Sequence, residues 1–150
     1  MDLILWRHAE AVDGYPDAER ALTEKGERDA KRMAKWLNDR LPDDAVIFVS
    51  PAQRTQQTAS ALRREFTTVA AIGTAAEPMD LLKAARWPRA AHTTLIVGHQ
   101  PTLGRVASLL LTGAEGELGV KKGAVWWITG RQRGGRVQPV LCVMMAPDML

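Results

Sequence analysis

The sequence contains one cysteine, Cys142, and this scarcity excludes an internal disulfide framework. There is no CxxC pair, the three histidines show no HxH or HExxH spacing, and the acidic residues do not follow EF-hand order, so we expect no metal and no other cofactor. No apolar run approaches the roughly 18 residues of a membrane span. The basic start and apolar core of a signal peptide are also missing. We therefore expect a cytoplasmic protein that contacts no membrane.

Internal repeats, low-complexity segments and a Pro/Ser-rich linker are absent too, which predicts a single domain over residues 1–150. With 46% apolar and 25% charged residues, the chain can build a core and keep a polar surface. The net charge of +3 suits an anionic partner such as a phosphate ester, a phosphoprotein or nucleic acid, but it does not choose among them. Trp126-Trp127 has no neighbouring stripe of aromatic and basic residues, so nucleic acid is not the expected partner.

Hydrophobic periodicity predicts alternating strands and helices. The strand candidates are residues 2–6, 45–49, 68–72, 94–97, 124–129 and 137–145, and the helix candidates are 24–41, 51–65, 78–85 and 101–112. Alternation of this kind predicts an α/β fold, a three-layer α/β/α sandwich with a mostly parallel central sheet. The glycine pair at 134–135 is interpreted as a hinge, and Cys142 as a small buried apolar residue.

The helix boundaries carry recognisable signals. Thr23 is placed to cap the first helix, and Pro42 follows its end. Ser50-Pro51 looks like an N-cap with proline at the first helical position. Gly113 follows the last helix.

Charged and imidazole side chains follow three of the predicted strands. Arg7-His8 ends the first strand, Arg54 lies in the first turn after the second, and Gly98-His99 ends the fourth. The carboxyl ends of parallel strands meet at one edge of a sheet, so these four side chains should converge in one crevice. Two arginines and two histidines near helix N-termini suit a tetrahedral dianion.

The same segments resemble the histidine phosphatase superfamily, which has the phosphoglycerate-mutase-like fold. LWRHAEA is similar to its RHG/RHA signature, VSPAQRTQQTA to its SPxxRxxQTA segment, and LIVGHQPTLG to its GHxP segment. ERALTEKGERDA is similar to the LTxxG helix opening that lies between the first two. The small size and the spellings RHAEA and GHQPTLG resemble the SixA-type phosphohistidine phosphatase branch most closely.

The resemblance implies roles for these residues. His8 is the expected nucleophile, which attacks phosphorus as a neutral imidazole and forms a phosphohistidine intermediate. Nearby arginines should favour the neutral form of its ring. Arg7 and Arg54 should clamp the phosphoryl oxygens, and His99 should donate to the same oxygens. Arg20, just before the LTxxG segment, is either a residue at the rim of the pocket that binds substrate or a solvated loop arginine.

The general acid used by the ester-cleaving members has no clear counterpart. Glu77 and Asp80 are the candidates, Glu77 being the first choice because Asp80 is also suited to the first turn of a helix. The lack of a clear general acid in the sequence favours a substrate whose leaving group already carries a proton, as the imidazole of phosphohistidine does. The short chain also has little length for a lid, so an open pocket could admit a side chain on a protein surface.

The sequence thus predicts a phosphatase that dephosphorylates phosphohistidine on a protein such as a phosphorelay component. Inorganic phosphate or sulfate should bind in the same pocket. The alternative within enzymes is a small phosphomonoesterase acting on sugar phosphates or similar metabolites, with Glu77 as the acid. The alternatives from other classes are a non-catalytic phosphoprotein-binding module and, motivated only by charge, a nucleic-acid binder.

Overall fold

Six strands form one sheet in the order β3-β2-β4-β1-β5-β6 in the computed structural model, which describes all 150 residues. The strands are β1 (Asp2–Arg7), β2 (Val46–Val49), β3 (Thr67–Thr68), β4 (Thr94–Gly98), β5 (Val125–Arg133) and β6 (Arg136–Met145). β1, β2, β3 and β4 run parallel, and β5 and β6 form an antiparallel hairpin against β1. The predicted α/β fold with a mostly parallel sheet is confirmed.

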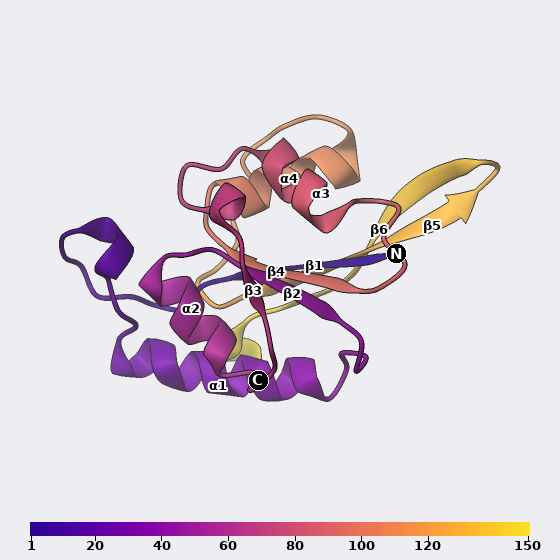
Figure 1. Cartoon of the computed structure of the whole chain (residues 1–150). Helices are drawn as coiled ribbons and strands as arrows, with labels where there is room; N and C mark the ends of the chain where they lie inside the picture. Colours follow the sequence, from indigo (N-terminus) through magenta and orange to yellow (C-terminus); the bar gives the residue numbers. More distant parts are fainter.

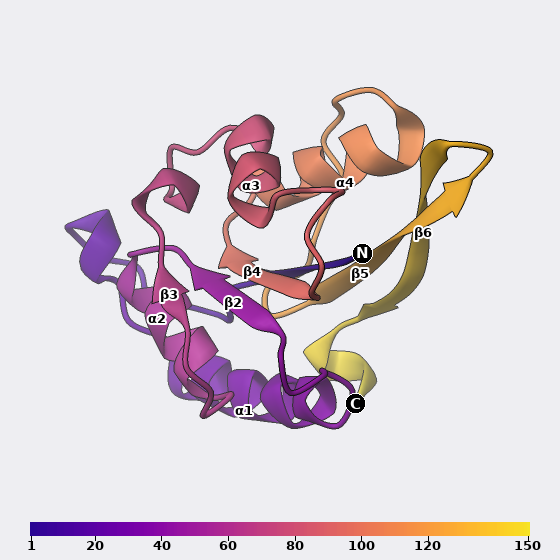
Figure 2. The ribbon, with the colours of Figure 1, turned by 45° about the vertical axis from the view of Figure 1, so that its right-hand side comes forward.

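Helices cover both faces of this sheet. α1 (Glu24–Asn38) and α2 (Gln53–Ser60) lie on one face, and α3 (Pro78–Ala85) and α4 (Thr102–Thr112) lie on the other (Figures 1 and 2). Three short 3-10 helices complete the elements: η1 (Asp17–Glu19), η2 (Ala70–Ile72) and η3 (Pro147–Met149). None of the helices has both the length and the apolarity to cross a membrane.

The first strand joins the two layers of the core. Leu3 and Leu5 belong to the buried cluster under α3 and α4, whereas Ile4 and Trp6 belong to the cluster against α1. All four side chains are fully buried, and each contributes roughly 1.5–3 kcal/mol of hydrophobic stabilisation. β1 is therefore firmly anchored, and so is the chain that follows it.

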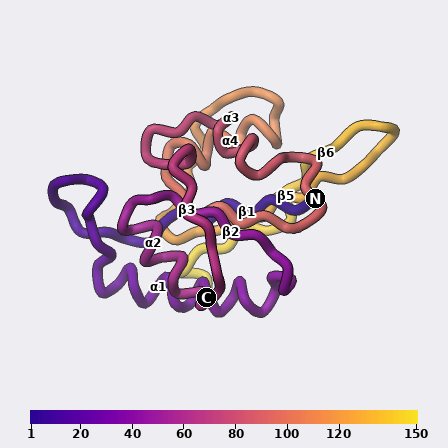
Figure 3. The backbone as a smooth tube through the Cα atoms, in the orientation of Figure 1, coloured from indigo at the N-terminus to yellow at the C-terminus, as the bar shows by residue number.

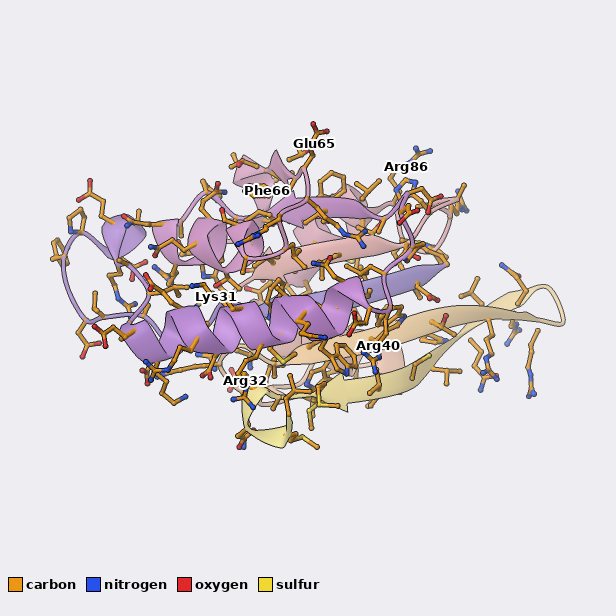
Figure 4. The ribbon with its side chains drawn as sticks, turned by 90° about the horizontal axis from the view of Figure 1, so that it is seen from below. Lys31, Arg32, Arg40, Glu65, Phe66 and Arg86 are labelled. Atoms are coloured by element: carbon orange, nitrogen blue, oxygen red, sulfur yellow. The ribbon has the colours of Figure 1, made fainter.

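Helix α1 begins as the sequence predicts. The side chain of Thr23 accepts a hydrogen bond of 2.9 Å from the Gly26 N–H, which satisfies one of the free donors of the first turn. The polar side of the helix faces solvent, as the side chains of Lys31 and Arg32 illustrate (Figure 4). The helix ends at Asn38, earlier than predicted, and the following residues form a turn that keeps Leu41 buried.

Two predicted elements near β2 are wrong in detail. Ser50 does not cap a helix: α2 begins at Gln53 with Ala52 as N-cap, and the Ser50 hydroxyl is bound to another side chain. The helix ends at Ser60 instead of continuing to residue 65, because the chain turns away and Arg63 takes a left-handed backbone conformation with φ of 54°. The predicted strand at 68–72 is reduced to Thr67–Thr68, followed by η2.

The C-terminal hairpin also differs from expectation. Gly134 and Gly135 form a two-residue turn with φ values of 55° and 76°, so they are a tight hairpin turn and not a hinge. The hairpin projects beyond the rest of the sheet (Figure 3). Cys142 is exposed, which corrects the prediction of a buried residue: β6 is an edge strand, and this position faces away from the core. Trp126 and Trp127 lie on opposite faces of the sheet, and each packs against a different core cluster.

Candidate active site

A cavity of about 220 Å³ opens at the carboxyl edge of the parallel strands. It contains Arg7 and His8 from the end of β1, Arg54 from the first turn of α2, and His99 from the end of β4. β1 and β4 are neighbours in a register that pairs Arg7 with Gly98, so each histidine follows one member of this pair. The ring centroids of the two histidines are 5.4 Å apart. The convergence predicted from the strand ends is thus present.

His8 is held in one orientation by the backbone. Its N–H donates to the Gly98 carbonyl at 3.2 Å, and its carbonyl accepts from the Gly123 N–H at 3.0 Å. Its Nδ1 lies 2.7 Å from the Ala9 carbonyl oxygen. A carbonyl can only accept, so Nδ1 carries the ring proton in the neutral form. Nε2 is therefore left with its lone pair free.

The environment favours the neutral form of His8. The pKa of His8 is lowered to about 4, chiefly by burial; the hydrogen bond to Ala9 opposes this shift, and the positive charges of Arg54 and Arg7 add to it. The sequence predicted the effect of the arginines, but burial is the larger cause. His8 is accordingly unprotonated near neutral pH and has the protonation state of a nucleophile.

His99 has a different partner. Its Nε2 lies 2.7 Å from the Ser50 hydroxyl, which also accepts a long hydrogen bond of 3.4 Å from the Ala52 N–H. The hydroxyl hydrogen is therefore free to point at Nε2, and we assign the ring proton of His99 to Nδ1. That atom is buried and has no hydrogen-bond partner. Burial, together with the nearby charges of His8 and Arg54, lowers the pKa of His99 to about 3.

The two arginines are each held by a residue that does not line the cavity. Arg7 donates from Nη1 to the Val120 carbonyl at 2.8 Å. Arg54 donates from Nη1 to the Asp17 carbonyl at 2.8 Å and from Nη2 to the Asp17 carboxylate at 3.0 Å. The Nε atoms of both arginines are buried without a partner. Two guanidinium groups are thus oriented while part of their donor capacity remains unused.

Thr58 ties the nucleophile loop to α2. Its hydroxyl accepts a 3.1 Å hydrogen bond from the Ala9 N–H and donates a 2.7 Å hydrogen bond to the Arg54 carbonyl. The structure shows a buried link between the residue after His8 and the residue that carries the second guanidinium.

Arg20, which the sequence left open as a rim residue or a solvated loop arginine, lies in the lining of the cavity. Its Nη1 pairs with Asp17 at 3.1 Å, and its Nε donates to the Val12 carbonyl at 2.8 Å. Hydrogen bonds from Arg20 and Arg54 lower the pKa of Asp17 below its ordinary value. One carboxylate therefore connects two arginines of the site.

Glu77 and Asp80 are not brought to the cavity. Glu77 is the N-cap of α3, it is exposed, and its carboxylate lies 3.7 Å from Arg105. Asp80 accepts a 2.9 Å hydrogen bond from the Glu77 N–H, which completes a capping box. Both acids thus stabilise the start of a helix, and neither lines the space around His8.

Several lining residues were missed by sequence reasoning. They are Ala11, Asp13, Thr74, Gln100 and Lys122. Among these, only Gln100 could have been expected from the sequence, because it directly follows His99. Its side chain donates to the Leu118 carbonyl and accepts from the Gly104 N–H. The others belong to loops whose course the sequence does not specify. Asp17 was also missed, although it stands three residues before Arg20 and pairs with it.

The donor set suits an anion more than a cation. No group of three or more His, Cys, Asp or Glu side chains is placed to hold a metal ion. The cavity instead gathers three arginines and one lysine around the two histidines. Cationic forks of this kind bind tetrahedral oxyanions through paired hydrogen bonds.

Comparisons with known proteins agree with this arrangement. Residues 3–81 match the family model described as Histidine phosphatase superfamily (branch 1). An uncharacterized protein of Picosynechococcus sp. is 32% identical over 151 residues, which cover 92% of this chain and 89% of that protein.

Two solved structures are similar over nearly the whole chain. SixA from Nakamurella multipartitia superposes with a TM-score of 0.78 and 27% identity, over 97% of this chain and 95% of that one. The protein histidine phosphatase SixA complexed with tungstate has a TM-score of 0.83 and 21% identity, over 99% of both chains.

Proposed function

The chain belongs to the histidine phosphatase superfamily, and we propose that it hydrolyses phosphohistidine on a protein with His8 as the nucleophile. One observation carries the proposal. Three buried donor atoms without partners, Nε of Arg7, Nε of Arg54 and Nδ1 of His99, belong to three residues that line one cavity together with His8. A buried donor without a partner is costly, and these three would be satisfied together by the oxygens of a phosphoryl group.

The first step transfers the phosphoryl group to the enzyme. Nε2 of neutral His8 forms a bond to phosphorus while the P–N bond of the substrate breaks, and its electron pair stays on the substrate nitrogen. The substrate imidazole is protonated at its other nitrogen, so it leaves as a neutral ring. Arg7, Arg54 and His99 donate to the phosphoryl oxygens, whose charge is spread in the transition state.

The second step restores the enzyme. Water forms a bond to phosphorus, the bond to Nε2 of His8 breaks, and the electron pair returns to that nitrogen. Inorganic phosphate and a proton are released. The hydrogen bond from Nδ1 of His8 to the Ala9 carbonyl can persist through both steps, so the ring keeps its orientation.

The substrate class is supported by three features. Glu77 and Asp80 lie outside the cavity, and a phosphohistidine leaving group needs an added proton less than an alkoxide does. The cavity volume of about 220 Å³ is below the roughly 300–1,000 Å³ of sites that enclose small molecules. The similar SixA structures carry names that refer to phosphohistidine or protein histidine phosphatases, and one contains tungstate, a tetrahedral oxyanion. Phosphate or sulfate should occupy the same cavity.

Rapid quenching with alkaline detergent, which preserves phosphohistidine, traps a phosphorylated enzyme and tests the function. A histidine-phosphorylated protein and a sugar phosphate are compared side by side. We expect acid-labile, base-stable labelling from the protein substrate, no labelling of His8→Ala, and much weaker labelling from the sugar phosphate. Activity of His8→Ala equal to wild type would exclude the mechanism, and labelling by the sugar phosphate alone would favour the phosphomonoesterase alternative.

Glu77→Gln separates the two enzymatic alternatives independently. Because Glu77 lies outside the cavity, we expect less than about a twofold change in kcat on an alkyl phosphate and on phosphohistidine. Gln keeps an acceptor oxygen for the capping box, so the helix should remain intact. A large loss of kcat confined to the ester would assign Glu77 the role of general acid.

A further inference from the structure

We propose that the loop Val12–Tyr15 beside the cavity is the docking element for the protein that carries the phosphoryl group. This inference rests on the proposed function and adds the surface by which the protein substrate is selected. The loop follows β1 and His8 in the chain. It belongs to the indigo segment that extends past α1 and α2 at the left of Figures 1 and 3.

The cavity itself recognises little beyond a phosphoryl group. Only Ala11 among its ten lining residues is hydrophobic, and its volume of about 220 Å³ leaves no room for a large apolar body. Preference for one phosphorylated molecule over another must therefore arise outside the cavity. The surface adjoining its mouth is the place where the rest of the substrate would make contact.

The loop exposes apolar surface at this place. Tyr15, the only tyrosine in the chain, is 99% exposed, and Val12 is 42% exposed. The other exposed large apolar residues lie on α3, on β6 and at the C-terminus. A tyrosine that makes no contact within the fold contributes nothing to the core, whereas tyrosines are frequent anchors in protein interfaces.

Hydrogen bonds also hold the chain at both ends of the loop. The Val12 N–H donates to the Ala21 carbonyl at 2.8 Å, and the Val12 carbonyl accepts from Arg20 at 2.8 Å. Just beyond Tyr15, Asp17 is fixed by Arg54 and Arg20. A loop that is already ordered loses less conformational entropy on binding.

Charge indicates the chemistry of the partner. Asp13 is fully exposed at the mouth of the cavity, where its carboxylate lies 4.0 Å from Nη2 of Arg20. An exposed carboxylate beside a site for a dianion repels that dianion unless the substrate also brings positive charge. The loop therefore fits a protein surface that combines an apolar patch with lysine or arginine side chains next to its phosphohistidine.

The test compares two substrates with the same P–N bond. One is histone phosphorylated chemically on histidine, which is basic, and the other is the free amino acid phosphohistidine. We expect wild type to have a higher kcat/KM on the histone, and the double variant Val12→Ser/Tyr15→Ser to lose this preference by about tenfold to thirtyfold. Tyr15→Phe should retain most of the preference. Leu141→Ser, at an exposed apolar position on β6, is the matched control and should keep it fully.

The outcomes separate this inference from the function on which it rests. If wild type hydrolyses neither substrate, the proposed function fails. If wild type hydrolyses both and the double variant keeps the wild-type ratio of kcat/KM values, the docking loop is excluded while the function stands. If the ratio of kcat/KM on the histone to kcat/KM on free phosphohistidine falls equally in Leu141→Ser, the docking loop is also excluded. A melting temperature of the double variant equal to that of wild type shows that the loss is not one of folding.

Discussion

The Ser50 hydroxyl and Nε2 of His99 form a buried hydrogen bond of 2.7 Å that joins the ends of two neighbouring parallel strands, β2 and β4. The residue that resembled a helix cap in the sequence thus orients an imidazole of the site. With Nε2 occupied, Nδ1 is the nitrogen of His99 that remains for a ligand. Ser50 acts through His99, as a positioning residue.

Ser50→Ala should lower kcat by about tenfold, because losing a buried hydrogen bond of about 1.5 kcal/mol frees the ring of His99 to rotate. Steady-state kinetics on phosphohistidine measure this effect. Ser108→Ala is the matched control, since Ser108 is also a buried serine, and its hydroxyl donates to the Ala114 carbonyl outside the cavity. Equal kcat values for wild type and Ser50→Ala would remove the assigned role.

Asp17→Asn should weaken binding of tungstate by about threefold to tenfold, with a smaller effect on kcat. The carboxylate holds Arg54 and Arg20 in place. Because the carboxylate is itself exposed, its loss should change the binding free energy of tungstate by only about 1 kcal/mol. Glu19→Gln, in the same short helix but without an ion pair, should bind tungstate like wild type. Calorimetry measures both dissociation constants. Tighter binding by Asp17→Asn would mean that the carboxylate competes with the anion for Arg54.

Stability should fall as the pH is lowered from 6.5 to about 4. Burial lowers the pKa of His8 to about 4 and of His99 to about 3, whereas 6.5 applies to an exposed histidine. Within this window the unfolded chain binds protons that the folded chain does not, so the free energy of unfolding falls as the pH is lowered. Each histidine contributes about 1.4 kcal/mol per pH unit across its window. Below pH 3 both states are protonated, and the contribution is fully lost.

Urea denaturation between pH 7.5 and pH 4 measures this dependence. Carboxylates also respond in the lower part of the range, so the comparison is made with His8→Asn, which lacks one of the two groups. The variant should lose less stability than wild type over the same interval. Identical pH dependence in the two proteins would contradict the low pKa of His8.

Gly26→Ala should destabilise the protein by about 1–3 kcal/mol and reduce activity as well. An added Cβ would lie 2.0 Å from the backbone oxygen of Glu10, two residues after His8, so the helix start or the nucleophile loop must move. Chemical denaturation and kinetics check both effects. Gly119→Ala has open space around the added Cβ and should be close to neutral. A Gly26→Ala variant as stable and as active as wild type would show that the close approach is not required.

Much of the fold follows from short-range patterns. The run Asp2–Trp6 was recognisable as a buried strand because its residues are nearly all apolar, and the helix after Thr23 because its cap and apolar stripe agree. The helix Pro78–Ala85 has the predicted bounds, since proline at the first position fixes its start. The segment 68–72 was less predictable, because a short apolar run fits a strand and a 3-10 turn equally well.

The sequence alone determined that Arg7, His8, Arg54 and His99 meet, because each follows a parallel strand and such strand ends share one edge of the sheet. It did not determine which hydrogen bonds orient them. The bonds from Ser50 to His99, from Asp17 to Arg54 and from Thr58 to the Ala9 N–H join residues distant in the chain, and only the packed sheet and loops bring them within reach. The positions of Glu77 and Tyr15 were likewise decided by the tertiary structure, because loops follow contacts that no local pattern encodes.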